Sequence, residues 1–531
     1  MFVQKRKYLG YKFNNIVLGV FAFIGGLAYS LARQIVYKNR VGINLGETIF
    51  VSIIWFLILM LILRIIYYVE NSTAKETKLF NKKKILALFF INLCINLICL
   101  LTYFPGVGMN DGLNIMYNGM SASRQFPVLY CFILTEITDI GKNLGNLQYS
   151  VAIYSILQII CVSAIYTWMM VWFFKKCAPK LVKYLIIAYF LVEPLLAMYA
   201  ISMLKDTLFS LLLLAFIMIS YDLVIEKEKI MRKKYWVGFF IVLLGILSLR
   251  NNGAYIVFPM LVILFVFSTS NRKGIICMII GSSLVFLMQK VLMSYFGTVQ
   301  MFQELVGIPL QQIAAVVANN GKIAPAEVEF LNTLMPLKEM AAQYNPFTVD
   351  VIKWNAHFNT KFLNEHKLEF LITWAKMLPE NFLIYVKAYL QQTFWFWAPW
   401  PEGTVQCLYS IETVSDNSWL VEFLKTSGIH DQPLLPAQLN NLLRSWYQLG
   451  NKFFREGVCF WIMLSTLVLS VLKNRNWRMI LVYAPALLLW LTIMISTPVA
   501  ESMRYVFVFA YALPFFVGVL FIKRKVKDVN I

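Results

Sequence analysis

The chain has 531 residues, of which 60% are hydrophobic, 16% aromatic and only 14% charged, and its formal net charge is +21. This composition, with repeated apolar stretches near the roughly 20 residues that a spanning helix needs, excludes a soluble fold and predicts an all-α polytopic membrane protein. The positive charge collects in short loops beside the apolar stretches, which is expected next to anionic lipid headgroups and argues against nucleic acid as a partner.

Twelve apolar segments along the chain are predicted to be membrane-spanning helices. Their approximate bounds are residues 14–36, 48–69, 85–104, 148–173, 181–199, 204–224, 235–249, 254–269, 275–295, 457–472, 479–497 and 505–522. The segments divide the chain into a membrane domain of nine spans over residues 1–295, a mainly helical extracytoplasmic domain over 296–456, and three C-terminal spans with a cytoplasmic tail over 457–531.

The loops between these segments predict the orientation. With the N-terminus inside, the inner segments hold about 27 of the 48 lysines and arginines and the outer short loops about seven, which satisfies the rule that inner loops are basic. The sequence therefore predicts a multi-pass protein of the cell membrane with both termini in the cytoplasm.

The first long outer loop carries an aspartate, Asp111. It lies between Asn110 and Gly112 and follows Gly106 and Gly108, where a flexible backbone would let an acidic group face a lipid-borne substrate. The alternative interpretation is a turn aspartate that hydrogen-bonds its own backbone.

Other polar residues fall at the outer ends of later spans or in the outer domain. They are Lys205, Asp206, Arg250, Asn251, Asn252, Gln311, Gln312, Glu501 and Arg504. With the predicted threading these residues share one compartment with Asp111. Polar chemistry gathered at one membrane face is more typical of an active site than of a pore.

The order of several short motifs resembles that of a known superfamily. Phe104-Pro105-Gly106, then Asp111, then Phe126-Pro127 before a short apolar helix is similar to the first outer loop of GT-C glycosyltransferases, most closely an uncharacterised branch of bacterial multispanning proteins. The further matches are Leu204-Lys205-Asp206, Leu249-Arg250-Asn251-Asn252-Gly253, Ile308-Pro309-Leu310-Gln311-Gln312, Asp350 with Lys353, and Glu501 with Arg504-Tyr505. The resemblance implies a GT-C-like fold, a sugar donor on a polyprenyl phosphate, and Asp111 as the catalytic carboxylate.

The chemistry of such a transfer reaction suggests roles for the other polar residues. Negative charge develops on the departing phosphate, so fixed cations are needed there. Arg504 is the first choice because a guanidinium binds phosphate with two parallel hydrogen bonds and keeps its charge, and Arg250 and Lys205 would add phosphate contacts. The orienting or sugar-binding candidates are Glu501, Asp206, Asn251, Asn252, Gln311 and Gln312. Asp206 would orient the adjacent Lys205 or act as the N-terminal acid of its helix. For the cations the alternative is a snorkelling or interfacial ion pair, and for the glutamines a solvated helix face.

The function expected from the sequence is transfer of a sugar from a polyprenyl-phosphate donor to a cell-envelope glycan or glycolipid, with Asp111 as general base. A lipid-linked oligosaccharide flippase or transporter, and a polysaccharide polymerase or ligase, are the alternatives. Transporters place ionisable groups near mid-bilayer and often consist of related halves, and the sequence has neither feature. His357, His366 and His430 lack metal-ligand spacing, so no metal site is predicted and a divalent cation is an optional cofactor.

Overall fold

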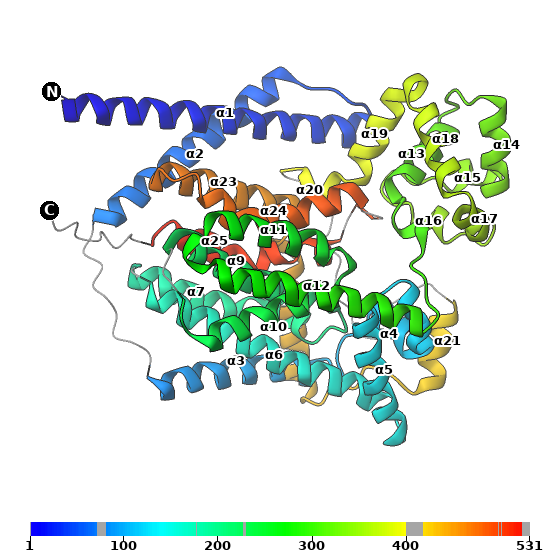
Figure 1. Ribbon diagram of the computed structural model, residues 1–531, viewed down its shortest axis with the longest axis horizontal. Coiled ribbons are helices and arrows are strands. Elements are labelled where there is room, and N and C mark those ends of the chain that lie inside the picture. The colour runs from blue at the N-terminus through cyan, green and yellow to red at the C-terminus, as the bar shows by residue number, and fades with distance from the viewer. Residues whose placement is uncertain are drawn as a thin grey trace.

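The computed structural model describes residues 2–71, 81–176, 178–226, 230–399, 418–496, 499–500 and 502–522. Throughout these residues the secondary structure is helical, and β pairing is limited to isolated bridges. Figure 1 shows long helices lying side by side in one bundle, with a group of short helices at one end of it. The protein is therefore all-α.

Eight helices of the described chain are long and apolar enough to cross a membrane. They are α1 (Phe2–Lys38), α2 (Leu45–Asn71), α3 (Lys82–Thr102), α6 (Gln148–Lys175), α9 (Lys205–Tyr221) with its helical continuation η2 (Asp222–Glu226), α12 (Arg272–Tyr295), α23 (Glu456–Asn474) and α24 (Met479–Ser496). This set makes the chain a polytopic membrane protein.

The other four predicted spans coincide with shorter or broken helices. α7 (Lys180–Val192) and α8 (Pro194–Ala200) form a pair bent by 52°, which would be a ninth crossing. The bend falls at Pro194, because proline lacks the backbone N–H that would continue α7. The remaining three are α10 (Lys233–Leu249), α11 (Ala254–Phe267) and α25 (Val508–Val519), which are each 17 residues or fewer. A count of twelve crossings stays a prediction.

At the centre of the bundle lies α9, which is apolar on all sides. Such a helix is stable only when other helices cover it, and α9 packs against α6, α10, α24 and α25. Its buried residues run from Asp206 to Tyr221. The first residue of this buried helix, Lys205, lies at the end of the bundle where the short helices gather.

The short helices belong to two groups. α4 (Asn110–Asn118), η1 (Gly119–Arg124) and α5 (Val128–Asn143) follow α3, and α21 (Ser418–Ser427) packs against α4. Residues 302–392, named here the distal unit, have a hydrophobic core of their own. The helices of this unit are η5 (Phe302–Glu304), α13 (Gly307–Ala318), α14 (Pro325–Leu334), α15 (Leu337–Gln343), α16 (Asp350–Lys353), α17 (Thr360–Glu365), α18 (Lys367–Met377), η6 (Pro379–Asn381) and α19 (Phe382–Gln392).

Residues after the distal unit return to the bundle. α20 (Phe394–Trp397) and α22 (Ala437–Phe453) contribute Phe394, Phe396 and Tyr447 to the core that the long helices share. The predicted extracytoplasmic segment 296–456 thus contains both the separate core of the distal unit and residues that pack with the bundle.

The two ends of the bundle differ in charge pattern. At the end of α9 opposite to Lys205, the Lys176 ammonium pairs with the carboxylates of Asp222 at 2.8 Å and Glu226 at 2.6 Å. The lysine-rich start of α3 also lies at this end, away from the distal unit (Figure 1). A helix of 17 residues separates the two ends by about 25 Å at 1.5 Å per residue.

Candidate functional site

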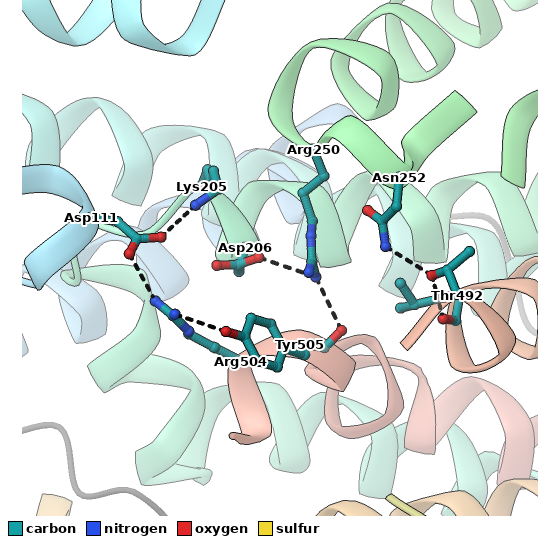
Figure 2. Close-up of polar contacts among 9 residues, drawn as sticks. Asp111, Lys205, Asp206, Arg250, Asn252, Thr492, Arg504 and Tyr505 are labelled. Carbon is teal, nitrogen blue, oxygen red and sulfur yellow. Dashed lines mark hydrogen bonds and ion pairs between the residues drawn. The ribbon is translucent and has the colours of Figure 1, made fainter. Parts of the chain in front are cut away.

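Five charged side chains come together at the end of the bundle next to the distal unit (Figure 2). This charged cluster consists of Asp111, Lys205, Asp206, Arg250 and Arg504. They come from segments far apart in the chain: α4, the start of α9, the residue after α10, and η8 (Met503–Val506). The structure thus brings together the predicted catalytic residue and all three predicted phosphate-binding cations.

Asp111 lies in the first turn of α4, where the helix dipole favours an acidic group. Its Oδ2 accepts a hydrogen bond from Lys205 Nζ at 2.5 Å, and its Oδ1 lies 3.2 Å from Arg504 Nη1. The Asp111 side chain keeps only 15% of its surface exposed. The carboxylate is therefore held between two cations and does not cap its own turn.

A close contact between two chain segments fixes the position of α4. Val107 forms a parallel bridge with Ser202, because Val107 N donates to Ile201 O at 3.0 Å and Met203 N donates to Val107 O at 2.9 Å. Next to Asp111, Gly112 fits against this segment because a Cβ there would lie 2.8 Å from Met203 Cβ and 3.0 Å from Met203 O. The bridge and this glycine place α4 beside the start of α9.

The surroundings of Asp111 determine its protonation. Burial raises the pKa of the carboxyl, but the nearby charges of Arg504 and Lys205 and their hydrogen bonds outweigh burial and hold the pKa well below its usual range. Asp111 is therefore ionised at neutral pH. A carboxylate with so low a pKa is a weak base for as long as both cations engage it.

Asp206 forms a second ion pair, with Arg250. The Asp206 side chain is only 2% exposed, and its Oδ1 lies 3.2 Å from Arg250 Nη1. Of the described residues none donates a hydrogen bond to this oxygen, so the contact is electrostatic without hydrogen-bond geometry. Asp206 was expected to orient Lys205 or to act as the N-terminal acid of its helix. It does lie in the first turn of α9, but its charged partner is Arg250.

Tyr505 connects the two arginines. Its hydroxyl accepts a hydrogen bond from Arg504 Nη2 at 3.1 Å, and its backbone carbonyl accepts one from Arg250 Nη1 at 3.1 Å. The two guanidinium carbons lie 4.9 Å and 5.4 Å from the centre of the Tyr505 ring, and Lys205 Nζ lies 4.7 Å from the centre of the Phe126 ring. Aromatic faces stabilise cations at such distances, so each cation of the cluster has an aromatic neighbour.

The cluster carries a net positive charge. Lys205, Arg250 and Arg504 contribute three positive charges and Asp111 and Asp206 two negative ones, which leaves +1 among the described members. An excess cation in a largely buried setting attracts an anion more strongly than the same charge would in water. The predicted orienting residue Glu501 lies outside the described residues.

Of the four predicted amide side chains, Asn251 and Asn252 lie beside the cluster. Asn252 Nδ2 donates to Thr492 Oγ1 of α24 at 2.8 Å (Figure 2). Asn251 is exposed and makes a long contact of 3.4 Å with Gln125 O.

Gln311 and Gln312 are not part of the cluster. Both are buried in the distal unit, where Gln311 Nε2 donates to Asn345 O at 2.6 Å and Gln312 Nε2 donates to Tyr385 O at 3.2 Å. The alternative interpretation of these glutamines, a solvated polar helix face, is therefore wrong for α13. The reason is that α15, α18 and α19 cover this helix on several sides.

Some residues of the site carried little signal in the sequence. Phe126 and Tyr505 occur in the quoted motifs without a role, and Thr492 was not singled out. A basic residue directly followed by an aromatic one, as in Arg504-Tyr505, is the signal that would have suggested a cation packed on a ring. For metal ions, no group of three or more histidine, cysteine or acidic side chains suited to ligation occurs in the portion of the chain that the structure describes.

The fold and the cluster together define a polytopic helical membrane protein with a largely buried charged site at one end of its bundle. Residues 121–530 match the family described as a family of unknown function, DUF6020, and the chain belongs to that family. The match contains Lys205, Asp206, Arg250 and Arg504 and begins after Asp111. No curated protein matches the chain, and no solved structure does.

Proposed function

We propose that this protein is a GT-C-type glycosyltransferase, which transfers a sugar from a polyprenyl-phosphate donor to a cell-envelope glycan or glycolipid. The observation that carries the proposal is the ionised Asp111 carboxylate, largely buried and held between Lys205 and Arg504. Transfer from a lipid phosphate needs these two components side by side, a base for the acceptor and cations for the leaving group.

Donor binding would change the state of Asp111. The phosphodiester of the donor presents two non-bridging oxygens, which share one negative charge, to Lys205 and Arg504 and competes with the carboxylate for their hydrogen bonds. As these cations turn toward the phosphate, the Asp111 pKa rises toward the range in which a carboxylate is a useful base. The competition therefore couples donor binding to activation of the base.

The reaction would then be a single displacement. Asp111 takes the proton of an acceptor hydroxyl as the acceptor oxygen bonds to the anomeric carbon of the sugar. The bond from that carbon to the phosphate oxygen breaks, and the lipid phosphate leaves with the electron pair, stabilised by Arg504 and Lys205. One displacement inverts the configuration at the anomeric carbon.

The other members of the site support this chemistry. Arg250, fixed by Asp206 and by the Tyr505 carbonyl, offers a further cation to the phosphate. Asn251 and Asn252 lie at its side and would hydrogen-bond the sugar hydroxyls. We assign the cluster to the outer face of the cell membrane, with both termini in the cytoplasm and twelve spans, because the lysine-rich helix ends lie at the opposite end of the bundle.

The experiment that tests the proposal compares the wild type with Asp111→Asn, purified in lipid. A panel of radiolabelled polyprenyl-phosphate sugars serves as donors and cell-envelope extracts serve as acceptors. We expect wild-type transfer and a loss of about 10²-fold to 10⁴-fold in the folded variant, which is the typical contribution of a general base. The matched control is Asp139→Asn on α5, whose carboxylate forms an exposed pair with Lys142 and should leave transfer unchanged.

The opposite result has a clear meaning. If the wild type transfers no sugar from any donor, and wild type and Asp111→Asn move lipid-linked sugar across the bilayer at equal rates, the transferase proposal fails and a flippase is the better explanation.

A further inference from the structure

A short segment of the distal unit pairs with the chain that leads to Arg504. The segment is residues 345–350, named here the strap. Ala500 N donates to Phe347 O at 2.8 Å, and Thr348 forms an antiparallel bridge with Val499. Ala500 precedes Arg504 by only four residues. The position of the strap therefore constrains the backbone that carries this arginine.

Gln311 holds the start of the strap. Its side chain is fully buried in α13, and Nε2 donates to Asn345 O at 2.6 Å. α13 also packs against α15, α18 and α19, so it is one of the best supported helices of the distal unit. Gln311 thus ties the strap to a rigid support, and loss of its amide would remove the hydrogen bond that holds the Asn345 carbonyl to α13.

Lys353 holds the other end of the strap. Its side chain is only 3% exposed, and Nζ lies 2.9 Å from Asp350 Oδ1 and 3.2 Å from Glu304 Oε2. Burial lowers the pKa of the Lys353 ammonium, but Asp350 and Glu304 outweigh burial and raise the pKa above its usual value. The ammonium is therefore charged and joins the strap to η5.

The chain just before η5 contacts the neighbourhood of Asp111. Ser123 Oγ donates to Thr298 Oγ1 at 2.9 Å, and Met301 N donates to Arg124 O at 3.1 Å. Ser123 and Arg124 belong to η1, which directly follows the helix of Asp111. The distal unit thus contacts the segment that follows the helix of Asp111 and the segment that precedes Arg504. Lys353 connects these two contacts.

We propose that the distal unit positions Arg504 against Asp111 through the strap, with Gln311 and Lys353 as positioning residues. Neither residue needs to touch a substrate in this arrangement. The inference rests on the proposed function only where transfer is the readout, since the pairing of residues 347–348 with 499–500 can be measured without any reaction.

The first arm of the test is a cross-link. Thr348→Cys with Val499→Cys, in the full-length protein in lipid, should oxidise readily, because directly opposed residues of an antiparallel pair have Cα atoms about 4.5 to 5.5 Å apart, within disulfide range. Adding Gln311→Met, which keeps the side-chain volume and removes the amide, should slow formation of the cross-linked peptide several-fold. Tyr385→Phe is the matched control. It deletes a 2.8 Å hydrogen bond to the Trp374 carbonyl within the same unit and should leave the cross-linking rate unchanged.

The second arm measures transfer. Gln311→Met should lower kcat roughly 10-fold to 100-fold, the cost expected when a catalytic group shifts by about 1 Å, and Tyr385→Phe should lower it far less. In the triple variant, oxidation of the cysteine pair should restore most of the lost activity and reduction should remove it again. Oxidised Gln311→Met without the pair shows whether the oxidant itself has an effect.

The outcomes separate the two proposals. If Gln311→Met leaves the cross-linking rate unchanged, or if the formed disulfide fails to restore transfer, the positioning inference is wrong. If cross-linking responds as expected while the wild type transfers no sugar, the strap inference stands and the glycosyltransferase proposal falls.

Discussion

At the residue scale, the most informative detail of the site is that the two terminal nitrogens of Arg504 contact different partners. One terminal nitrogen of the guanidinium faces Asp111, while the other donates to the Tyr505 hydroxyl. Only a planar group with several fixed donors makes both contacts at once. The positive charge alone does not explain why the residue is an arginine.

Replacement of Arg504 by lysine tests this interpretation. Arg504→Lys keeps the charge but has a single nitrogen, so we expect it to lose one contact and to lower kcat/KM about 10-fold to 100-fold, or roughly 1.4 to 2.7 kcal/mol. The assay is the transfer reaction with varied donor concentration. Arg33→Lys alters a half-exposed pair with Glu47 and should behave as wild type. Equal activity of Arg504→Lys and wild type would mean that charge is all that the site needs.

Residue pairs also mark the limit of prediction from sequence. The sidedness of the loops correctly grouped Asp111, Lys205, Arg250 and Arg504, but it did not give the pairing. Asp206 was expected to orient its neighbour Lys205. Adjacent residues on a helix point in directions about 100° apart, so Lys205 reaches Asp111 while Asp206 reaches Arg250.

At the scale of elements, the contact between α4 and the segment before α9 determines whether Asp111 meets Lys205. Helix propensity alone would make Gly112→Ala stabilising, because alanine favours helix more than glycine does. The Cβ would however lie 2.8 Å from Met203 Cβ and 3.0 Å from the Met203 carbonyl, and a backbone atom cannot move aside cheaply. The steric term therefore outweighs the propensity term.

We expect Gly112→Ala to lower the free energy of unfolding by about 1 to 3 kcal/mol, the usual cost of overpacking, and to lower transfer by separating α4 from α9. Thermal unfolding in detergent measures the change in the free energy of unfolding. Gly238→Ala in α10, where a Cβ meets nothing within 4 Å, should be neutral or slightly stabilising. A Gly112→Ala protein as stable as that control would contradict the proposed packing.

Prediction of elements was accurate for the long apolar segments and failed for the surroundings of polar residues on a short helix. All twelve predicted apolar segments coincide with helices, because a long apolar segment can be recognised in the sequence without knowledge of the helices that pack against it. The burial of Gln311 and Gln312 could not be predicted from the sequence. Polar residues on a short helix predict a solvated face, and only the tertiary structure shows that α13 is enclosed.

At the scale of the whole molecule, the separation of charge is the main feature. The charged cluster and the distal unit share one end of the bundle, while Lys176 and the lysine-rich start of α3 are at the other (Figure 1). The rule that inner loops are basic predicts that the cluster faces outward.

Labelling of single cysteines in cells tests the orientation. In a background with the eight native cysteines replaced by serine, Lys142→Cys near the cluster end should react with a membrane-impermeant maleimide. Lys83→Cys, exposed at the opposite end, should react only after permeabilisation. The reversed pattern would place the charged cluster on the inner face and would rule out an outer-leaflet donor.

The double engagement of Asp111 by Lys205 and Arg504 has a kinetic consequence. Under the proposed function, Asp111 is a weak base as long as Lys205 and Arg504 engage it. It becomes a useful base when the donor phosphate binds these two cations. An acceptor that arrives first meets a carboxylate too weak to deprotonate it, because both cations still engage Asp111. Substrate order is therefore built into the ion pairs, with the donor binding first and the acceptor second.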